Sequence, residues 1–260
     1  MENKINRRKA VMLLGGMAGA GAAANLIARA DEVIQPAPKS VLNKIPWPYK
    51  PLDPEVAAQR GFDGFYKAEC CFGVFDPVAG GVADQLGSPY TEFPFLMFKY
   101  GGGGVKGWAT LCGTLNGAAA AIQLVSPDPD PVVNALFEWY EHTELPNVRP
   151  RGAKFAEFRS TANSPMCHQS IASWIKVSHK HAYCPERSER CACLAASVAK
   201  QTALLLNAQA AGKPVAFSLP KETQGCMSCH EKGSVLENAR TKMDCGGCHA
   251  PLIGKHPSKT

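Results

Sequence analysis

The sequence lacks the features of several large protein classes. It contains no uninterrupted run of about twenty strongly apolar residues, the length that a membrane-spanning helix requires. Strand-type alternation of apolar and polar residues is nearly absent, and no basic run follows the first thirty residues. We therefore expect a mainly α protein that neither crosses a membrane in its mature form nor binds nucleic acid.

Cysteine, by contrast, is abundant. The chain of 260 residues carries 11 cysteines, which is several times ordinary usage. Its hydrophobic content of 45% excludes a disordered protein and is enough for a core without a disulfide scaffold. The cysteines are therefore expected to hold a bound group.

The first thirty residues have the composition of an export signal. The charged stretch Asn6-Arg7-Arg8-Lys9 precedes a weakly apolar segment, residues 10–27, and Ala28-Arg29-Ala30 closes it. This pattern predicts a twin-arginine signal peptide over residues 1–30, cleaved after Ala30, and a periplasmic protein. A membrane anchor is disfavoured because glycines interrupt the apolar segment.

Two segments are expected after the signal. Residues 31–213 are predicted to form a helical, cysteine-rich domain that opens with an extended, proline-punctuated arm, and residues 214–260 to form an irregular C-terminal segment. Capping residues and apolar periodicity predict helices, the first capped by Asp63 and the third started by Asp130-Pro131, over about residues 63–75, 105–124, 130–140, 164–180 and 185–211.

A glycine run at residues 101–104 invites comparison with a phosphate-binding loop. The comparison fails because Gly107 follows Lys106, where such a loop requires Ser or Thr. We expect the glycines to let the backbone turn and approach neighbouring helices closely.

The last forty residues carry two C-x-x-C-H motifs, Cys226-Met-Ser-Cys229-His230 and Cys245-Gly-Gly-Cys248-His249. In this spacing two thiols bond to the vinyl groups of one haem and the next histidine ligates its iron. A zinc site built from two C-x-x-C pairs does not explain why a histidine follows both pairs. The motifs predict two covalent haems c, with His230 and His249 as proximal ligands.

The two haems are expected to lie close together. Each porphyrin exposes an apolar face that costs about 25 cal/mol per Å² when left in water. The short tether between the motifs favours haems that cover each other, with the body or a second subunit as further cover.

The second axial ligands are expected to be histidines, which give a low-spin iron suited to electron transfer, whereas an open sixth position would bind a substrate or gas. For each candidate the alternative is a surface or hydrogen-bonded histidine, and Met227 and Met243 lie too close to the attachment cysteines to reach over a distal face easily. The candidates are His142, His168, His179, His181 and His256.

Seven cysteines remain outside the haem motifs, an odd number that excludes complete internal disulfide pairing. Cys167 is expected in the first turn of a helix, where the positive helix end lowers a thiol pKa. Cys191 is expected to point inward, and Cys193 to lie about 200° further round the same helix. Four inward thiols from four segments suit an iron–sulfur cluster, while buried apolar cysteines or one or two disulfides are the alternative. The cluster candidates are Cys70, Cys112, Cys167 and Cys191.

These features resemble the split-Soret cytochromes c of sulfate-reducing bacteria over essentially the whole chain, and the body resembles the wider C-GCAxxG-C-C family. The segment Cys112-Gly113-Thr114-Leu115-Asn116-Gly117 stands for the central motif, with Thr and Leu where Ala is usual. The first cysteine of the family corresponds to Cys70 or Cys71, and the last two to Cys167 and Cys191. The additional cysteines are Cys71, Cys184 and Cys193.

The resemblance implies a homodimer whose haems are grouped at one end, parallel and nearly touching within a subunit, so that exciton coupling splits the Soret band. It also implies bis-histidine ligation, for which His168 is favoured, followed by His256, which would reach a haem of the partner subunit. A non-haem iron centre of the [2Fe–2S] type is implied on the body cysteines, with Cys184 and Cys193 as alternative ligands.

Together these expectations describe a periplasmic electron carrier, not an enzyme, that exchanges single electrons with redox partner proteins. A different hypothesis is a small oxidoreductase that reduces an oxyanion or a sulfur compound at an open haem or at the iron–sulfur site. A third is a non-redox protein whose cysteines store iron.

Overall fold

The structure is a computed structural model that describes residues 44–155 and 157–253. The described residues belong to one compact unit. The predicted signal peptide, most of the predicted arm and the candidate ligand His256 lie outside the described residues. Residues 44–52 have no helix or strand, as the prediction of an extended arm requires.

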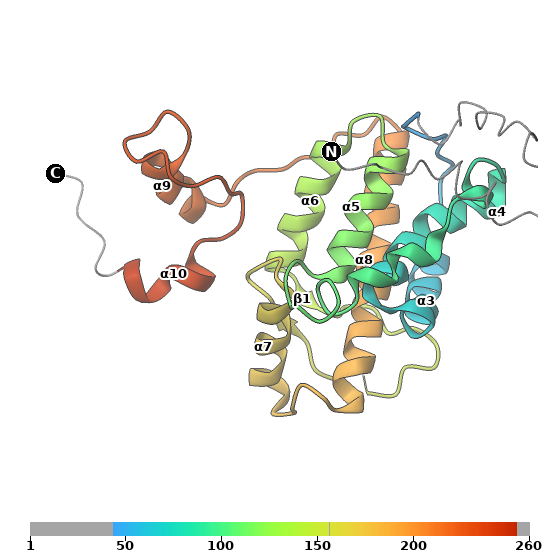
Figure 1. Cartoon of the computed structure of the whole chain (residues 1–260), viewed down its shortest axis with the longest axis horizontal. Helices are drawn as coiled ribbons and strands as arrows, with labels where there is room; N and C mark the ends of the chain where they lie inside the picture. The colour runs from blue at the N-terminus through green and yellow to red at the C-terminus, as the bar shows by residue number, and fades with distance from the viewer. Residues whose placement is uncertain (1–43, 156, 254–260) are drawn as a thin grey trace, which may run out of the picture. The chain divides into compact units, whose positions relative to one another are not determined.

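The described part of the chain is mainly α, which confirms the predicted fold class (Figure 1). The larger helices pack as a bundle around α8, while two-residue strands β1 (Glu144–Leu145) and β2 (Ser160–Thr161) pair antiparallel, with Glu144 opposite Thr161. The helices of the body are α3 (Pro54–Phe75), α4 (Gly81–Leu86), α5 (Gly113–Val125), α6 (Pro129–His142), α7 (Cys167–Ser178) and α8 (Pro185–Ala210), joined by the short turns η2 (Asp76–Gly80), η3 (Tyr90–Glu92) and η4 (Phe95–Gly101).

Helix α8 is the central element of the bundle. It begins at Pro185, as predicted, and every residue from 189 to 199 is buried. Cys193 is therefore as inaccessible as Cys191, because α8 is covered on more than one side, and the contrast expected between these two residues is absent. Among the described helices α8 alone has the length and hydropathy of a membrane span, yet 67% of its most apolar stretch is buried inside the protein.

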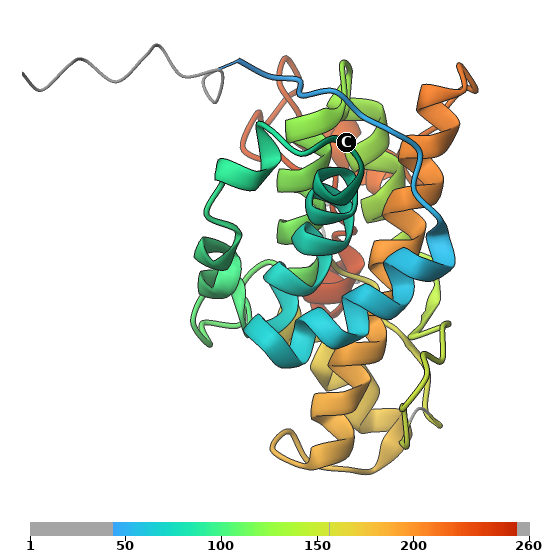
Figure 2. The same ribbon diagram turned by 90° about the vertical axis from the view of Figure 1, so that its right-hand side faces the viewer.

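Helix α3 crosses α8 and makes its most extensive contact with it (Figure 2). The helix begins at Pro54, with the Asp53 carboxylate accepting hydrogen bonds from the amides of the first turn. The prediction that Asp63 caps this helix is wrong, since the apolar periodicity extends through Asp63 toward the N-terminus. At Ala68 and Glu69 the helix is interrupted, and Glu69 has a φ of 70°.

Three other helices begin at positions that differ from the predicted ones. Helix α5 begins at Gly113 rather than near residue 105, because most residues of the 103–109 loop have positive φ values that an α-helix does not contain. Helix α6 begins at Pro129, two residues early, and α7 begins at Cys167, after Met166 forms a β-bridge with Leu111.

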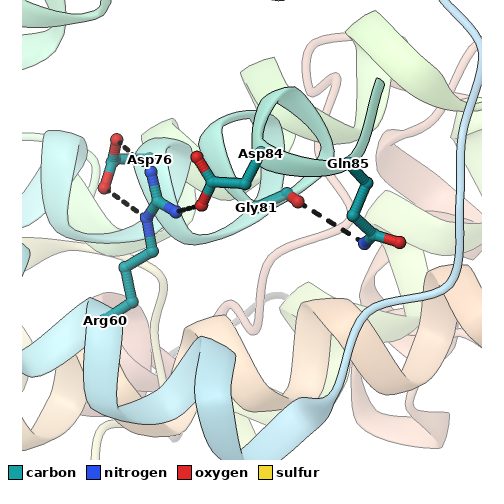
Figure 3. Close-up of polar contacts among 5 residues, drawn as sticks. All are labelled: Arg60, Asp76, Gly81, Asp84 and Gln85. Atoms are coloured by element: carbon teal, nitrogen blue, oxygen red, sulfur yellow. Dashed lines mark hydrogen bonds and ion pairs between the residues drawn. The ribbon is translucent and has the colours of Figure 1, made fainter. Parts of the chain in front are cut away.

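A partly exposed cluster of ion pairs connects α3 with η2 and α4 (Figure 3). The Arg60 guanidinium donates to both carboxylate oxygens of Asp76, with Nε–Oδ2 and Nη2–Oδ1 distances of 2.7 and 3.1 Å, and also to Asp84. Nearby, the Gln85 side chain donates to the Gly81 carbonyl at 3.4 Å. The bidentate pair holds the start of η2, which leads into α4, against α3.

Glycines bring α5 against the cysteine-bearing turn of α3. A Cβ atom at Gly117 would collide with the carbonyl oxygen of Cys71, and one at Gly113 would collide with the Gly101 carbonyl and approach Cβ of Cys70 to 2.8 Å. Gly101, in the glycine run at residues 101–104, makes the close approach predicted for that run, since a Cβ atom there would collide with Cβ of Cys71. The close approach of α5 to α3 places Cys112, which directly precedes α5, beside Cys70.

Candidate redox centres

The first C-x-x-C-H motif lies on α9 (Lys221–His230), a helix of the C-terminal segment. Its Met227 is buried, while Cys226, Cys229 and His230 are half-buried. The Nδ1 atom of His230 lies 2.7 Å from Oδ1 of Asn238, a contact in which the histidine donates. With its proton on Nδ1, the imidazole carries on Nε2 the lone pair that an iron ligand needs.

The second motif begins just before α10 (Gly246–Ile253), whose first amide donates to Oδ1 of Asp244 at 2.7 Å. Cys248 and His249 are exposed. The segment before the motif lies against the loop that precedes α7, where Oγ of Ser164 lies 3.9 Å from Sδ of Met243. The second motif is thus close in space to the start of α7.

The two motifs meet at their first cysteines. Burial raises the pKa of Cys245, and the charge of Cys226 and a hydrogen bond with that thiol raise it further. The structure therefore brings the two predicted haem attachment sites next to each other.

A cavity of about 1060 Å³ lies between α6 and the C-terminal segment. Its apolar lining includes Val133 and Phe137 of α6 together with Phe217, Met227 and Met243 of the segment. A large planar macrocycle needs such an apolar wall beside its attachment thiols. The residues of both motifs, with this cavity, fit covalent haem.

The four cysteines proposed as cluster ligands come together in the body. Burial raises the pKa of Cys70 well above its usual value, and the charges of Cys191, Cys112 and Cys167 add to the effect. Such mutual effects require short distances. Cys70, Cys112 and Cys191 are buried and Cys167 is half-buried, so four thiols from four segments gather around one interior region.

Hydrogen bonds hold two of these cysteines together. The Cys112 amide donates to the Pro165 carbonyl at 2.8 Å, and the Cys167 amide donates to the Thr110 carbonyl at 2.7 Å. The loop before α5 and the start of α7 are therefore fixed to each other. The donor set suits iron, although among the described residues no three histidine, cysteine or acidic side chains already converge on a metal position.

The electrostatic expectation for Cys167 is wrong in sign. Burial, followed by the charges of Cys112 and Cys191, raises its pKa to about 12, despite its place in the first turn of α7. Desolvation and neighbouring thiolates outweigh the helix dipole here. A thiolate at this site therefore requires a bound cation.

The remaining body cysteines have different surroundings. Burial raises the pKa of Cys71 to about 12, with a further contribution from Cys112, and burial raises that of Cys193 to about 12, with further contributions led by Glu189. Cys184 instead caps α8, its Sγ accepting from the Arg187 amide at 3.4 Å. All eleven cysteines lie in the described residues, and each is a free thiol.

The four described histidines predicted as candidate distal haem ligands differ in their contacts. His168 is exposed and lies four residues after Ser164, which contacts Met243 just before the second C-x-x-C-H motif. His142 is exposed and its Nδ1 lies 2.9 Å from the Glu138 carbonyl, while His179 ends α7 in a left-handed conformation. His181 is also exposed.

Two side chains beside the cysteine group were not predicted. Arg190, directly before Cys191, is 2% exposed, and its Nη2 donates to Oγ of the buried Ser170 at 2.9 Å. The buried Tyr140 hydroxyl lies near Cys112 and Ser170, without a hydrogen bond of ordinary length. The only sequence signal for a buried polar group here is that Arg190 directly precedes the small and apolar residues 191–196.

Comparison with known proteins identifies the family of the chain. The family described as "Putative redox-active protein (C_GCAxxG_C_C)" matches residues 75–205, a range that contains Cys112, Cys167 and Cys191 but begins after Cys70. The split-Soret cytochrome c of Desulfovibrio desulfuricans is 36% identical to the chain, with 95% of each protein covered. The chain belongs to the split-Soret cytochrome c family.

A solved structure from this family has the same fold. The split-Soret cytochrome c of D. desulfuricans ATCC 27774, reported with a novel iron centre, superposes with a TM-score of 0.75 and 34% identity, covering 81% of this chain and 93% of the other. The resemblance predicted from the haem motifs and the cysteine spacing is confirmed. The assignment to split-Soret cytochromes supports a role in electron transfer.

Proposed function

We propose that this split-Soret family member is a periplasmic dihaem c-type cytochrome that transfers electrons between two bis-histidine haems and an iron–sulfur centre. The observation that carries the proposal is the meeting of two C-x-x-C-H motifs at Cys226 and Cys245, beside an apolar cavity. The relatives support it, since one is a cytochrome c and its structure was reported with an iron centre. Redox partner proteins and a second copy of the chain are the proposed partners.

The haem-binding residues have separate tasks. Cys226 and Cys229 would anchor one haem, and Cys245 and Cys248 the other, while His230 and His249 would ligate the irons. A bound haem supplies one-electron chemistry. The chain contributes apolar cover from α6 and a hydrogen bond from His230 to Asn238 that orients the ring.

The four gathered thiols of Cys70, Cys112, Cys167 and Cys191 are the proposed ligands of a [2Fe–2S] centre. A bound metal would overcome the raised pKa values of Cys70 and Cys167, because a coordinated thiol is deprotonated outright. The pairing of Cys112 and Cys167 through backbone hydrogen bonds keeps their segments in register.

A short path joins the two kinds of centre. The second haem segment contacts Ser164, Cys167 follows three residues later, and the Pro165 carbonyl between them accepts the hydrogen bond of Cys112. The contact of 3.9 Å between Met243 and Ser164, the covalent bonds of residues 164–167 and one hydrogen bond thus lead from the C-terminal segment to two of the proposed iron ligands. This arrangement supports electron transfer between the centres.

The test is the iron content of a ligand variant. We expect the wild-type protein to contain about four iron atoms per chain, two in haem and two in the cluster. The Cys112→Ser variant should lose the non-haem iron and keep both haems. Cys184→Ser, which changes a helix cap outside the group, should keep all the iron. An unchanged iron count in Cys112→Ser would contradict the assignment, and about two atoms in the wild type would exclude the cluster.

A further inference from the structure

Arg190 carries a buried positive charge, and no carboxylate in the part of the chain that the structure describes forms an ion pair with it. Its side chain lies on α8 and is 2% exposed, and its Nε atom has no hydrogen-bond partner. Within residues 44–155 and 157–253 no acidic group lies within 4.0 Å of the guanidinium, and the adjacent Glu189 accepts instead from the amides of Lys154 and Phe155. Burial of a charge without a counter-charge is costly, so the protein needs a negative group here.

The groups around Arg190 are the proposed iron ligands and their neighbours. Cys191 follows Arg190 directly in the chain. The positive charge of Arg190 also acts to lower the pKa of Cys167 and that of the buried Tyr140 hydroxyl, against the larger raising effect of burial. The hydrogen bond from Nη2 to Ser170 holds the guanidinium against α7, three residues after Cys167. The missing negative charge therefore belongs at the thiol group.

We propose that Arg190 is the buried counter-charge of the iron centre and sets its reduction potential. This inference rests on the proposed iron–sulfur centre. Iron bound by several thiolates carries net negative charge, and one further electron increases it. A fixed cation beside the ligands favours the reduced state, so it raises the reduction potential, and no bond is made or broken in the step. Arg190 is a positioning and charge-compensating residue and does not ligate iron.

Two variants separate the charge of Arg190 from its shape. Arg190→Gln removes the charge and keeps a side chain able to donate to Ser170, whereas Arg190→Lys keeps the charge. The measurement is a potentiometric titration of the full-length haem-loaded protein, in which paramagnetic resonance follows the iron centre and absorption follows the haems. The iron content of each variant is determined in parallel.

We expect Arg190→Gln to lower the equilibrium constant for reduction of the iron centre about tenfold, which is a shift of about 59 mV to more negative potential. Arg190→Lys should keep a potential near that of the wild type, and the haems should not change in either variant. Loss of the non-haem iron from Arg190→Gln, with retention in Arg190→Lys, would also support the proposal, because the charge alone separates the two variants.

Two results would overturn it. One is a wild-type potential in Arg190→Gln with the iron retained. The other is loss of the iron from both variants with the haems intact, which would indicate that the shape of the arginine matters rather than its charge. A wild-type protein without non-haem iron would instead refute the proposed iron centre itself, so the two failures are distinguishable.

Discussion

Asn238 lies eight residues beyond the histidine that it contacts. The loop between them folds back, and the backbone amides of Asn238 and Ala239 both donate to the His230 carbonyl, at 3.1 and 3.0 Å. This doubled backbone contact places the amide side chain at Nδ1. A residue outside the C-x-x-C-H motif therefore orients the imidazole of His230, the proposed proximal ligand, and raises its basicity.

Substitution of Asn238 should change the potential of one haem only. Asn238→Leu removes the acceptor at Nδ1, which makes the imidazole less basic and stabilises ferric iron less, so the potential of that haem should rise by roughly 59 mV for a tenfold change. Asn238→Asp offers a stronger acceptor and should lower it. Spectroelectrochemistry of the two haems measures both effects. Equal shifts of both haems, or opposite signs, would contradict the assigned contact.

At the scale of elements, the glycines of α5 decide how closely two cysteine-bearing segments approach. Gly117 lies against the Cys71 carbonyl, and Gly113 lies against Cβ of Cys70. Any side chain at these positions separates α5 from α3. The proposed iron site therefore depends on glycines, which carry no functional group.

Gly117→Ala should destabilise the protein and weaken its hold on non-haem iron. The new Cβ would collide with a backbone carbonyl, which cannot rotate away, and overpacking of this kind costs about 1–3 kcal/mol. Thermal unfolding and iron analysis measure the two effects. The control is Gly225→Ala on α9, where a Cβ meets nothing within 4 Å. Equal stability of the two variants would contradict the close approach.

The helices were predictable in kind but not in their starting points. Pro185 starts α8 as expected, because proline fits the first turn and a cap precedes it. The start of α3 was missed although Asp53-Pro54 is the same pattern of cap and proline, because the prediction took the equally suitable cap Asp63 as the start of the helix. The interruption at Glu69 has no local sequence signal.

The candidate site likewise contains residues that the sequence predicted and residues that it did not. The proposed haem ligands were predicted from a covalent attachment motif, whose spacing is a chemical requirement and does not depend on the fold. The gathering of Cys70, Cys112, Cys167 and Cys191 was predicted from resemblance and helix faces. Arg190 was not predicted, because its importance lies in the absence of a nearby carboxylate, which only three-dimensional packing reveals.

At the scale of the whole molecule, the C-terminal segment must stay close to the body so that the proposed haems are covered. Lys242 donates to Oδ1 of Asn134 on α6 at 2.9 Å, and Ser164 contacts Met243, so both sides of the cavity are joined at its rim. Apolar haem faces need this cover, together with the cover that one haem gives the other. If the two proposed haems are in contact, they form a single absorbing unit, and removal of one should change the spectrum of the other.

A variant with only the second motif tests this coupling. In Cys226→Ala/Cys229→Ala the first haem has no attachment thiols, while Cys245 and Cys248 still hold the second. We expect one haem per chain and a single, unsplit Soret band, because exciton coupling requires a second chromophore in contact. Absorption spectra and haem quantification provide the measurement, with Cys184→Ser as a control that should keep two haems and the split band. A split band that persists in the one-haem variant would place the coupling between subunits rather than within one, and sedimentation velocity on the same sample would then detect the dimer that such coupling requires.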